Sequence, residues 1–258
     1  MKTRRLAIAG VALATALGLA GCDRSGDHQT SPGTAATSAA AADPAAELTA
    51  ASNKLGEQPL KAKMDMGAAM SATGVADQKN RKADMTIRIN AGGQKMDMKM
   101  RLLGPDLYLQ FGGPLGASLD GGGKTWMHVD ATKIPAGSQL NVDNLVNADK
   151  FLAGLGKVEK VGAGDFKGVL DMSRAQGQET SLAALGEKAK AVPFTAKVDD
   201  QGRLAELVID MNGLGLPAQG SGKITAKYYD FGSPITVEAP PGEQVREMPA
   251  DMLKSFTG

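Results

Sequence analysis

In residues 83–111, ADMTIRINAGGQKMDMKMRLLGPDLYLQF, apolar and polar residues alternate over three successive segments. The segments are separated by Ala91-Gly92-Gly93 and by Gly104-Pro105. A period of two is typical of strands with one buried and one solvated face, and short glycine-containing breaks between such runs are typical of hairpins. The run therefore predicts three antiparallel strands of a meander.

The same alternation predicts further strands at 60–66, 125–130, 158–162, 166–172, 194–198, 204–211 and 224–231, about nine to eleven in all. A glycine-rich loop is expected before residue 125. Apolar residues three and four positions apart instead predict helices at 48–55, 141–156, 179–191 and 251–256.

These elements predict an α+β fold, in which a strongly curved antiparallel β-sheet forms a half-barrel. A sheet of this many strands curls, and its apolar face must be covered. We expect a few α-helices to cover the concave face and to enclose a hydrophobic cavity, because so few helices leave part of that face unfilled.

Residues 1–21 have the layout of a signal peptide. Lys2, Arg4 and Arg5 precede an apolar or small-residue stretch from residue 6 to residue 20. A retained transmembrane anchor is the alternative, but it needs roughly 20 apolar residues in helix.

The signal ends in Leu19-Ala20-Gly21-Cys22, which resembles the lipobox of bacterial lipoproteins. Cys22 is the single cysteine, so no disulfide forms within the chain, and lipidation explains its presence better than an exposed free thiol does. Acylation of Cys22 would anchor the protein to the extracytoplasmic face of the cell membrane. Residues 22–44, which contain almost nothing bulky, are predicted to be a disordered tether, and residues 45–258 are predicted to be one domain.

Charge and chemistry exclude several classes of function. After residue 21 the chain has 26 basic and 28 acidic residues, a net charge of −2, which does not favour nucleic acid as a partner. Of the two histidines, His28 falls in the tether and His128 on a strand face, and no zinc, cofactor or nucleophile motif accompanies them. Residues 199–202 lack the later glutamate of a calcium loop, so a hairpin turn is expected there. The sequence predicts neither an enzyme nor a cofactor or metal site.

Methionines concentrate on the face of the sheet that is predicted to point inward. Flexible, polarisable side chains adapt to varied apolar partners, although an ordinary core accounts for them equally well. The side chains predicted to line a lipid cavity are Met64, Met66, Met85, Ile87, Met96, Met98, Met100, Leu107, Leu109 and Met127.

Three segments carry a resemblance to a known family, together with the lipobox and the tether. They are residues 106–109 (DLYL), 124–130 (KTWMHVD) and 229–240 (YDFGSPITVEAP). On these segments the domain resembles, over nearly all its length, the actinobacterial LppX/LprA/LprF/LprG-type envelope lipoproteins. The resemblance implies a fold similar to LolA and LolB, with helices over the open side of a half-barrel. It also implies that acylated lipids or lipoglycans bind between sheet and helices and move outward through the envelope.

Two functions from different classes remain. The first is a carrier of lipid or glycolipid, anchored to the cytoplasmic membrane through Cys22. The second is a structural or regulatory envelope lipoprotein that binds another exported protein through its surface. A continuous apolar cavity favours the first, and a close-packed interior favours the second.

Overall fold

The alternating run forms the three strands that its pattern predicts, β3 (Lys82–Ala91), β4 (Gln94–Leu103) and β5 (Asp106–Phe111). The β3–β4 turn contains Gly92 and Gly93, with φ of 57° and 80°. Glycine adopts this left-handed conformation without the steric penalty of a Cβ, which is why the hairpin reverses there.

The structure is a computed structural model that describes residues 43–120, 122–135, 152–174, 186–215 and 222–257. Residues 41–258 form one compact unit. Besides β3–β5 it contains β1 (Leu60–Asp65), β2 (Met70–Asp77), β6 (Trp126–Asp130), β7 (Leu155–Lys160), β8 (Asp165–Leu170), β9 (Val192–Val198), β10 (Leu204–Asp210), β11 (Lys223–Tyr229) and β12 (Val245–Glu247).

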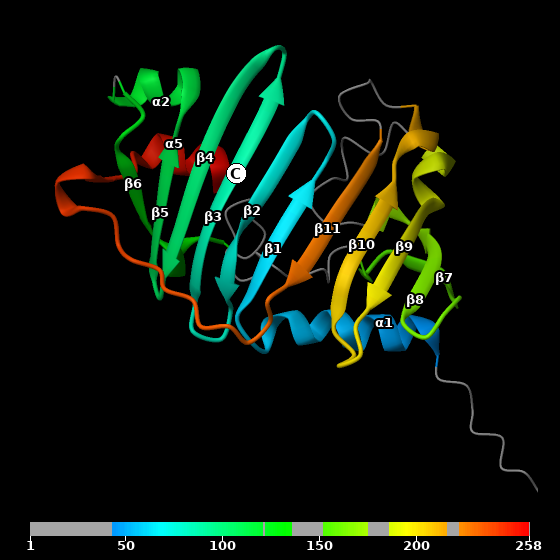
Figure 1. Cartoon of the computed structure of the whole chain (residues 1–258). Coiled ribbons are helices and arrows are strands. Elements are labelled where there is room, and N and C mark those ends of the chain that lie inside the picture. The colour runs from blue at the N-terminus through cyan, green and yellow to red at the C-terminus, as the bar shows by residue number, and fades with distance from the viewer. Residues whose placement is uncertain (1–42, 121, 136–151, 175–185, 216–221, 258) are drawn as a thin grey trace, which may run out of the picture. The chain divides into compact units, whose positions relative to one another are not determined.

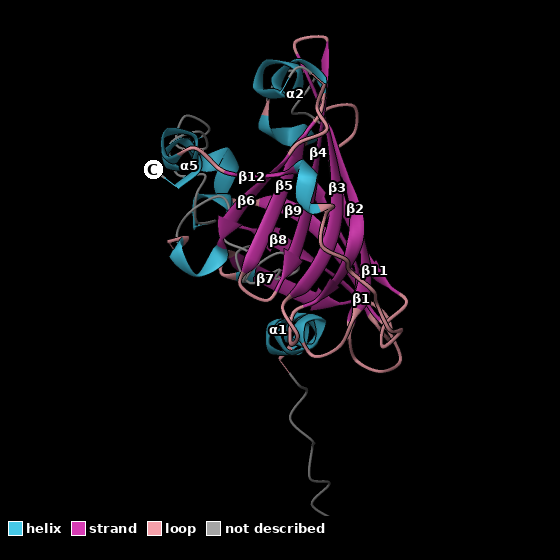
Figure 2. Cartoon of the chain, turned by 90° about the vertical axis from the view of Figure 1, so that its left-hand side faces the viewer, coloured by secondary structure: helices cyan, strands magenta, loops and turns pink. Residues whose placement is uncertain are grey.

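The twelve strands of the described residues form a single sheet in the order β12-β6-β5-β4-β3-β2-β1-β11-β10-β9-β8-β7. The sheet is curved and open (Figures 1 and 2), since no pairing joins β12 to β7 in the described part of the chain. Strands β1–β6 form one antiparallel meander and β7–β11 a second one. The two meanders meet in mid-sheet, where β1 pairs antiparallel with β11.

In the described ranges three α-helices accompany the sheet: α1 (Pro44–Asn53), α2 (Gly113–Asp120) and α5 (Ala250–Thr257). Helix α1 begins four residues before the predicted helix, because Asp43 caps it by accepting a hydrogen bond from the Ala45 amide at 3.0 Å. It buries Leu48 and Ala51 in the hydrophobic core and contacts β7 and β10. None of the helices in the described ranges is long and apolar enough to cross a membrane.

Several predictions of local structure are wrong. The sheet has twelve strands, not nine to eleven. Strand β2 forms in a segment for which no element was predicted, because its inward residues after Met70 are Ala72, Gly74 and Ala76, which are too small to produce an apolar alternation. Helix α2 occupies the first part of the predicted glycine-rich loop, whose described residues 122–124 have neither helix nor strand. Strand β12 runs parallel to β6, so the sheet is not wholly antiparallel.

Other predictions fall wholly or partly outside the described residues. The signal peptide, Cys22 and the tether up to residue 42 lie there, as do residues 141–151 and 179–185 of the two predicted middle helices. At the ends of those helices the structure differs from the prediction. Leu155 begins β7, and Gly186–Lys190 is a short 3-10 helix before β9.

Candidate functional site

The inward face of β1–β6 is arranged in rows of opposed side chains. Residues that face each other on adjacent antiparallel strands point to the same side, so the register defines which side chains share a row. In the first row no residue is more than 4% exposed. Its members are Leu60, Ala76, Ala83, Leu102, Leu107 and Val129. This row is close-packed core.

The second row changes from buried to half-buried across the sheet. Met100, Leu109 and Met127 are buried on β4, β5 and β6, whereas Met85 on β3 is half-buried. Met85 lies opposite Gly74, and its Cγ is 2.8 Å from the place where a Cβ on that glycine would be. The flexible Met85 side chain therefore occupies the space that the glycine leaves.

The third and fourth rows are the least covered. In the third row Met64, Ile87 and Met98 are half-buried. Ala72, which lies between Met64 and Ile87, is buried, and so is Phe111, which lies next to Met98. The fourth row, which contains Met70, Ile89 and Met96, is half-buried throughout. Met66 lies at the same end of the face and is also half-buried.

Along the third row, this partial exposure is confined to the first meander. The third row continues from Met64 into the second meander through Ala226, Leu207, Ala196 and Phe166, all of which are buried. Small residues therefore occupy the middle of the sheet, where Ala226 and Ala72 flank Met64. On the neighbouring row Tyr228 lies opposite Ala62, and burial raises the pKa of Tyr228 to about 12.

A hollow lies at the fourth row, beside α2. It has a volume of about 150 Å³ and is lined by Ile89, Gln94, Met96, Pro114 and Leu115. Two larger hollows, of about 350 and 430 Å³, lie over β8 and β9. Charged residues from β7 to β10 line these hollows in part, and neither hollow includes a residue predicted to line the cavity.

The strand register places nine of the ten residues predicted to line a cavity on the inward face, and Met66 follows the end of β1. The surroundings of the ten residues differ. Met100, Leu107, Leu109 and Met127 lie in the buried core, Met85 and Met98 are half-buried against it, and Met64, Met66, Ile87 and Met96 are half-buried beyond it. Cys22, the predicted lipidation site, lies outside the described residues.

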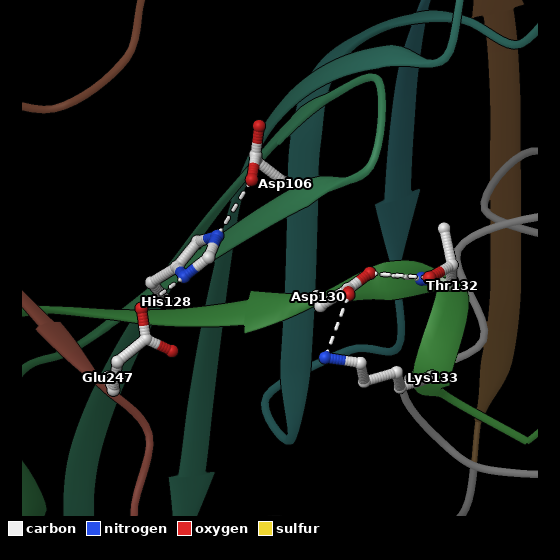
Figure 3. A network of polar contacts seen from close by, with 6 residues as sticks. All are labelled: Asp106, His128, Asp130, Thr132, Lys133 and Glu247. Atoms are coloured by element: carbon white, nitrogen blue, oxygen red, sulfur yellow. Dashed lines mark hydrogen bonds and ion pairs between the residues drawn. The ribbon is translucent and has the colours of Figure 1, made fainter.

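The opposite face carries a charged cluster at β5, β6 and β12 (Figure 3). His128 Nε2 lies 2.8 Å from Asp106 Oδ1, and its Nδ1 lies 2.7 Å from Glu247 Oε1. The ring of Tyr108 lies 5.2 Å from the imidazole, measured between centroids, and burial raises the pKa of Tyr108. Burial of the imidazole lowers the pKa of His128, but its hydrogen bonds to Asp106 and Glu247 outweigh that effect, so the pKa is raised overall.

Two further contacts surround this cluster. Hydrogen bonds from the Thr132 hydroxyl and from Lys133 lower the pKa of Asp130, which caps the turn after β6. Arg101 pairs with Asp84 at 3.0 Å and lies 4.9 Å above the Trp126 ring.

The sequence placed His128 on a strand face but did not identify its two carboxylate partners. Asp106 lies 22 positions before it on the paired strand β5, and helix α2 separates the two strands in the sequence. Glu247 lies 119 positions after it, and no local pattern predicts that contact.

Within the described ranges, no group of three or more His, Cys, Asp or Glu residues is placed to hold a metal ion. Neither a scan against protein-family models nor a search of curated proteins gave a match for this chain.

Proposed function

We propose that this chain is a membrane-anchored envelope lipoprotein that binds an acylated lipid or glycolipid in a hydrophobic cavity and carries it across the envelope. The observation that carries the proposal is the half-buried state of the third and fourth rows. Met64, Ile87 and Met98 keep apolar surface accessible on the same face that buries the first row completely.

Leaving apolar side chains in water forgoes about 25 cal/mol per Å² of the surface that burial would remove. An acyl chain laid over these rows would remove that surface from water. In the proposed arrangement the sheet is a half-barrel, helices cover its concave face, and the cavity lies between them. Small residues in the middle of the sheet, such as Ala72 and Ala226, project little side chain onto this face, and the methionines would adjust to the shape of an acyl chain.

The proposed anchor explains the order of segments along the chain. Residues 1–21 would direct export and be removed, and acylated Cys22 would hold the protein at the extracytoplasmic face of the cell membrane. A flexible tether of the composition of residues 22–44 has a root-mean-square reach of roughly 25 Å. That reach keeps the cavity beside the membrane from which a lipid would be taken. In this proposal the protein carries lipid without a catalysed reaction or a cofactor.

Photo-crosslinking tests the proposal on the full-length chain. The probe is a diacyl phospholipid with a diazirine in one acyl chain, mixed into vesicles with the purified protein. After illumination and digestion, we expect mass spectrometry to find adducts at Met64, Ile87 and Met98. Met98→Glu should lower the yield about fivefold or more, because a buried carboxylate is incompatible with an apolar ligand.

The matched control is Lys99→Glu, which changes the next residue of β4 on the opposite, exposed face. It should leave the yield unchanged. Fluorescence of Trp126 verifies that both variants fold. If no adduct forms on the inward face, or if both variants lose it equally, the carrier function is wrong. The result would then favour a structural lipoprotein that binds another exported protein through its surface.

A further inference from the structure

The segment between β11 and α5 crosses one meander of the sheet. We call residues 231–249 the strap; in Figure 1 it runs in orange from the end of β11 past the ends of β1–β5 to the far edge. The Gly232 amide donates to Pro59 O at 2.8 Å, and Arg101 Nη1 donates to Glu238 O at 3.1 Å. Val237 is buried along the strap. The strap therefore follows a defined path on the protein.

The far end of the strap is held at β6. There β12 pairs parallel with β6, and the Met248 amide donates to His128 O at 2.9 Å. The side chain of Met248 is buried. Glu247 of the strap also contacts the His128 ring of β6, which gives this end of the strap a charged interaction.

The geometry at His128 specifies its charge state. Carboxylate oxygens face both ring nitrogens, Asp106 from β5 at 2.8 Å and Glu247 from β12 at 2.7 Å. A neutral imidazole has one N–H and can donate to only one of them, whereas an imidazolium donates to both. Among the described residues, the other titratable group facing the ring is Tyr108 on β5.

We propose that His128 is a pH-responsive latch: its imidazolium holds the strap on β6 through Glu247, and loss of the proton weakens this hold. The strap is also held by backbone hydrogen bonds, by the buried side chains of Val237 and Met248, and by contacts with Arg101 and Arg203, and these contacts stay unchanged near neutral pH. His128 alone among these groups has an ordinary pKa in that range.

The direction of the response follows from the raised pKa of His128. The stabilisation is fully present below the unfolded-state pKa of about 6.5 and is lost as the pH rises through the higher folded-state value. The Glu247 side chain is 80% exposed, so solvent screens the pair. We therefore expect a local loosening of about fivefold rather than unfolding.

Hydrogen–deuterium exchange of the full-length chain in detergent micelles measures the latch. Protection factors correct for the intrinsic pH dependence of exchange, and the Met248 amide is the reporter. Between pH 5.5 and 8.5 its protection should fall about fivefold. The Val198 amide, which donates to Gly164 O in the second meander, should keep its protection.

Two variants separate the latch from general stability. His128→Gln should give pH-independent protection at the level of the unlatched protein. Glu247→Gln should also remove the response at Met248, although NMR of the imidazole still detects titration of His128 beside Asp106. Because Glu247 is mostly exposed, this variant keeps the test valid if His128→Gln does not fold.

Three results would overturn the proposal. They are a Met248 protection factor that is equal at both pH values in the unmodified protein, a His128 that stays charged up to pH 8.5, and a pH response that persists in Glu247→Gln.

Discussion

Truncating one residue in each of two neighbouring rows tests whether the inward face changes from closed core to accessible surface. Leu109 in the second row is 0% exposed, whereas Ile87 in the third row is half-buried. The compared variants are Leu109→Ala and Ile87→Ala. Both substitutions shorten a branched aliphatic side chain on the inward face, Leu109 on β5 and Ile87 on β3.

The expected losses of stability differ because the surroundings differ. Leu109 lies in the buried core cluster, so its truncation leaves a cavity and should cost ~3 kcal/mol of unfolding free energy. Ile87 already exposes part of its surface, leaves a smaller void and should cost only ~1 kcal/mol. The predicted difference of about 2 kcal/mol is larger than the error of a denaturant experiment.

Urea unfolding of the full-length chain in a nonionic detergent measures both values. Trp126 is the single tryptophan and is 5% exposed, so its fluorescence reports when unfolding exposes β6 to solvent. Equal losses for the two variants would refute the argument, because they would mean that the third row is as tightly packed as the second. The proposed lipid site would then lose its main support.

Three further predictions concern other parts of the chain. Gly74→Ala should cost about 2 kcal/mol in the same urea assay, because the new Cβ would overlap the Asp84 carbonyl oxygen and lie 2.7 Å from Met85 Cα; an unchanged midpoint would contradict this. Absorbance titration at alkaline pH should show one tyrosine ionising near pH 12 that disappears in Tyr228→Phe, and stability should fall between about pH 10 and 12, since the raised pKa favours the neutral folded form. Cys22→Ala should move the protein from the detergent phase to the aqueous phase in phase partitioning, and retention in the detergent phase would exclude lipidation as the anchor.

The strands with large inward residues could be predicted from sequence. In β3, β4 and β5 a methionine, leucine or isoleucine recurs at every second position, so the period is visible without any tertiary information. In β2 the corresponding positions include Ala72 and Gly74, which give no hydrophobic period. That strand exists because β1 and β3 pair with it on both sides, and such pairing is a tertiary effect.

The sequence at the beginning of helix α2 contains a residue that favours a helix start. Pro114 follows Gly113 at its beginning, and proline is favoured in the first helical turn because its missing N–H has no intrahelical partner there. The three-residue strand β12 gives no comparable signal, since its pairing with β6 depends on the path of the whole strap.

For the candidate site, the sequence predicted the face but not its burial. Alternation places Met98 and Met100 on the same side of β4. It does not predict that Met98 is half-buried and that Met100 is buried. That difference depends on which neighbours lie above each row. The carboxylates around His128 were missed for a related reason, because Glu247 meets it only through the strap.

The pairing of β1 with β11 has a consequence for folding kinetics. Within each meander the paired strands follow one another in sequence, so each meander can form from contacts that are closer in sequence than the β1–β11 pair. The pair that unites them joins segments from opposite ends of the domain, and its loop-closure entropy is correspondingly large. We expect this step to limit the folding rate. During synthesis, one edge of β1 therefore has to wait for nearly the entire chain, and until then other chains can join that unpaired edge.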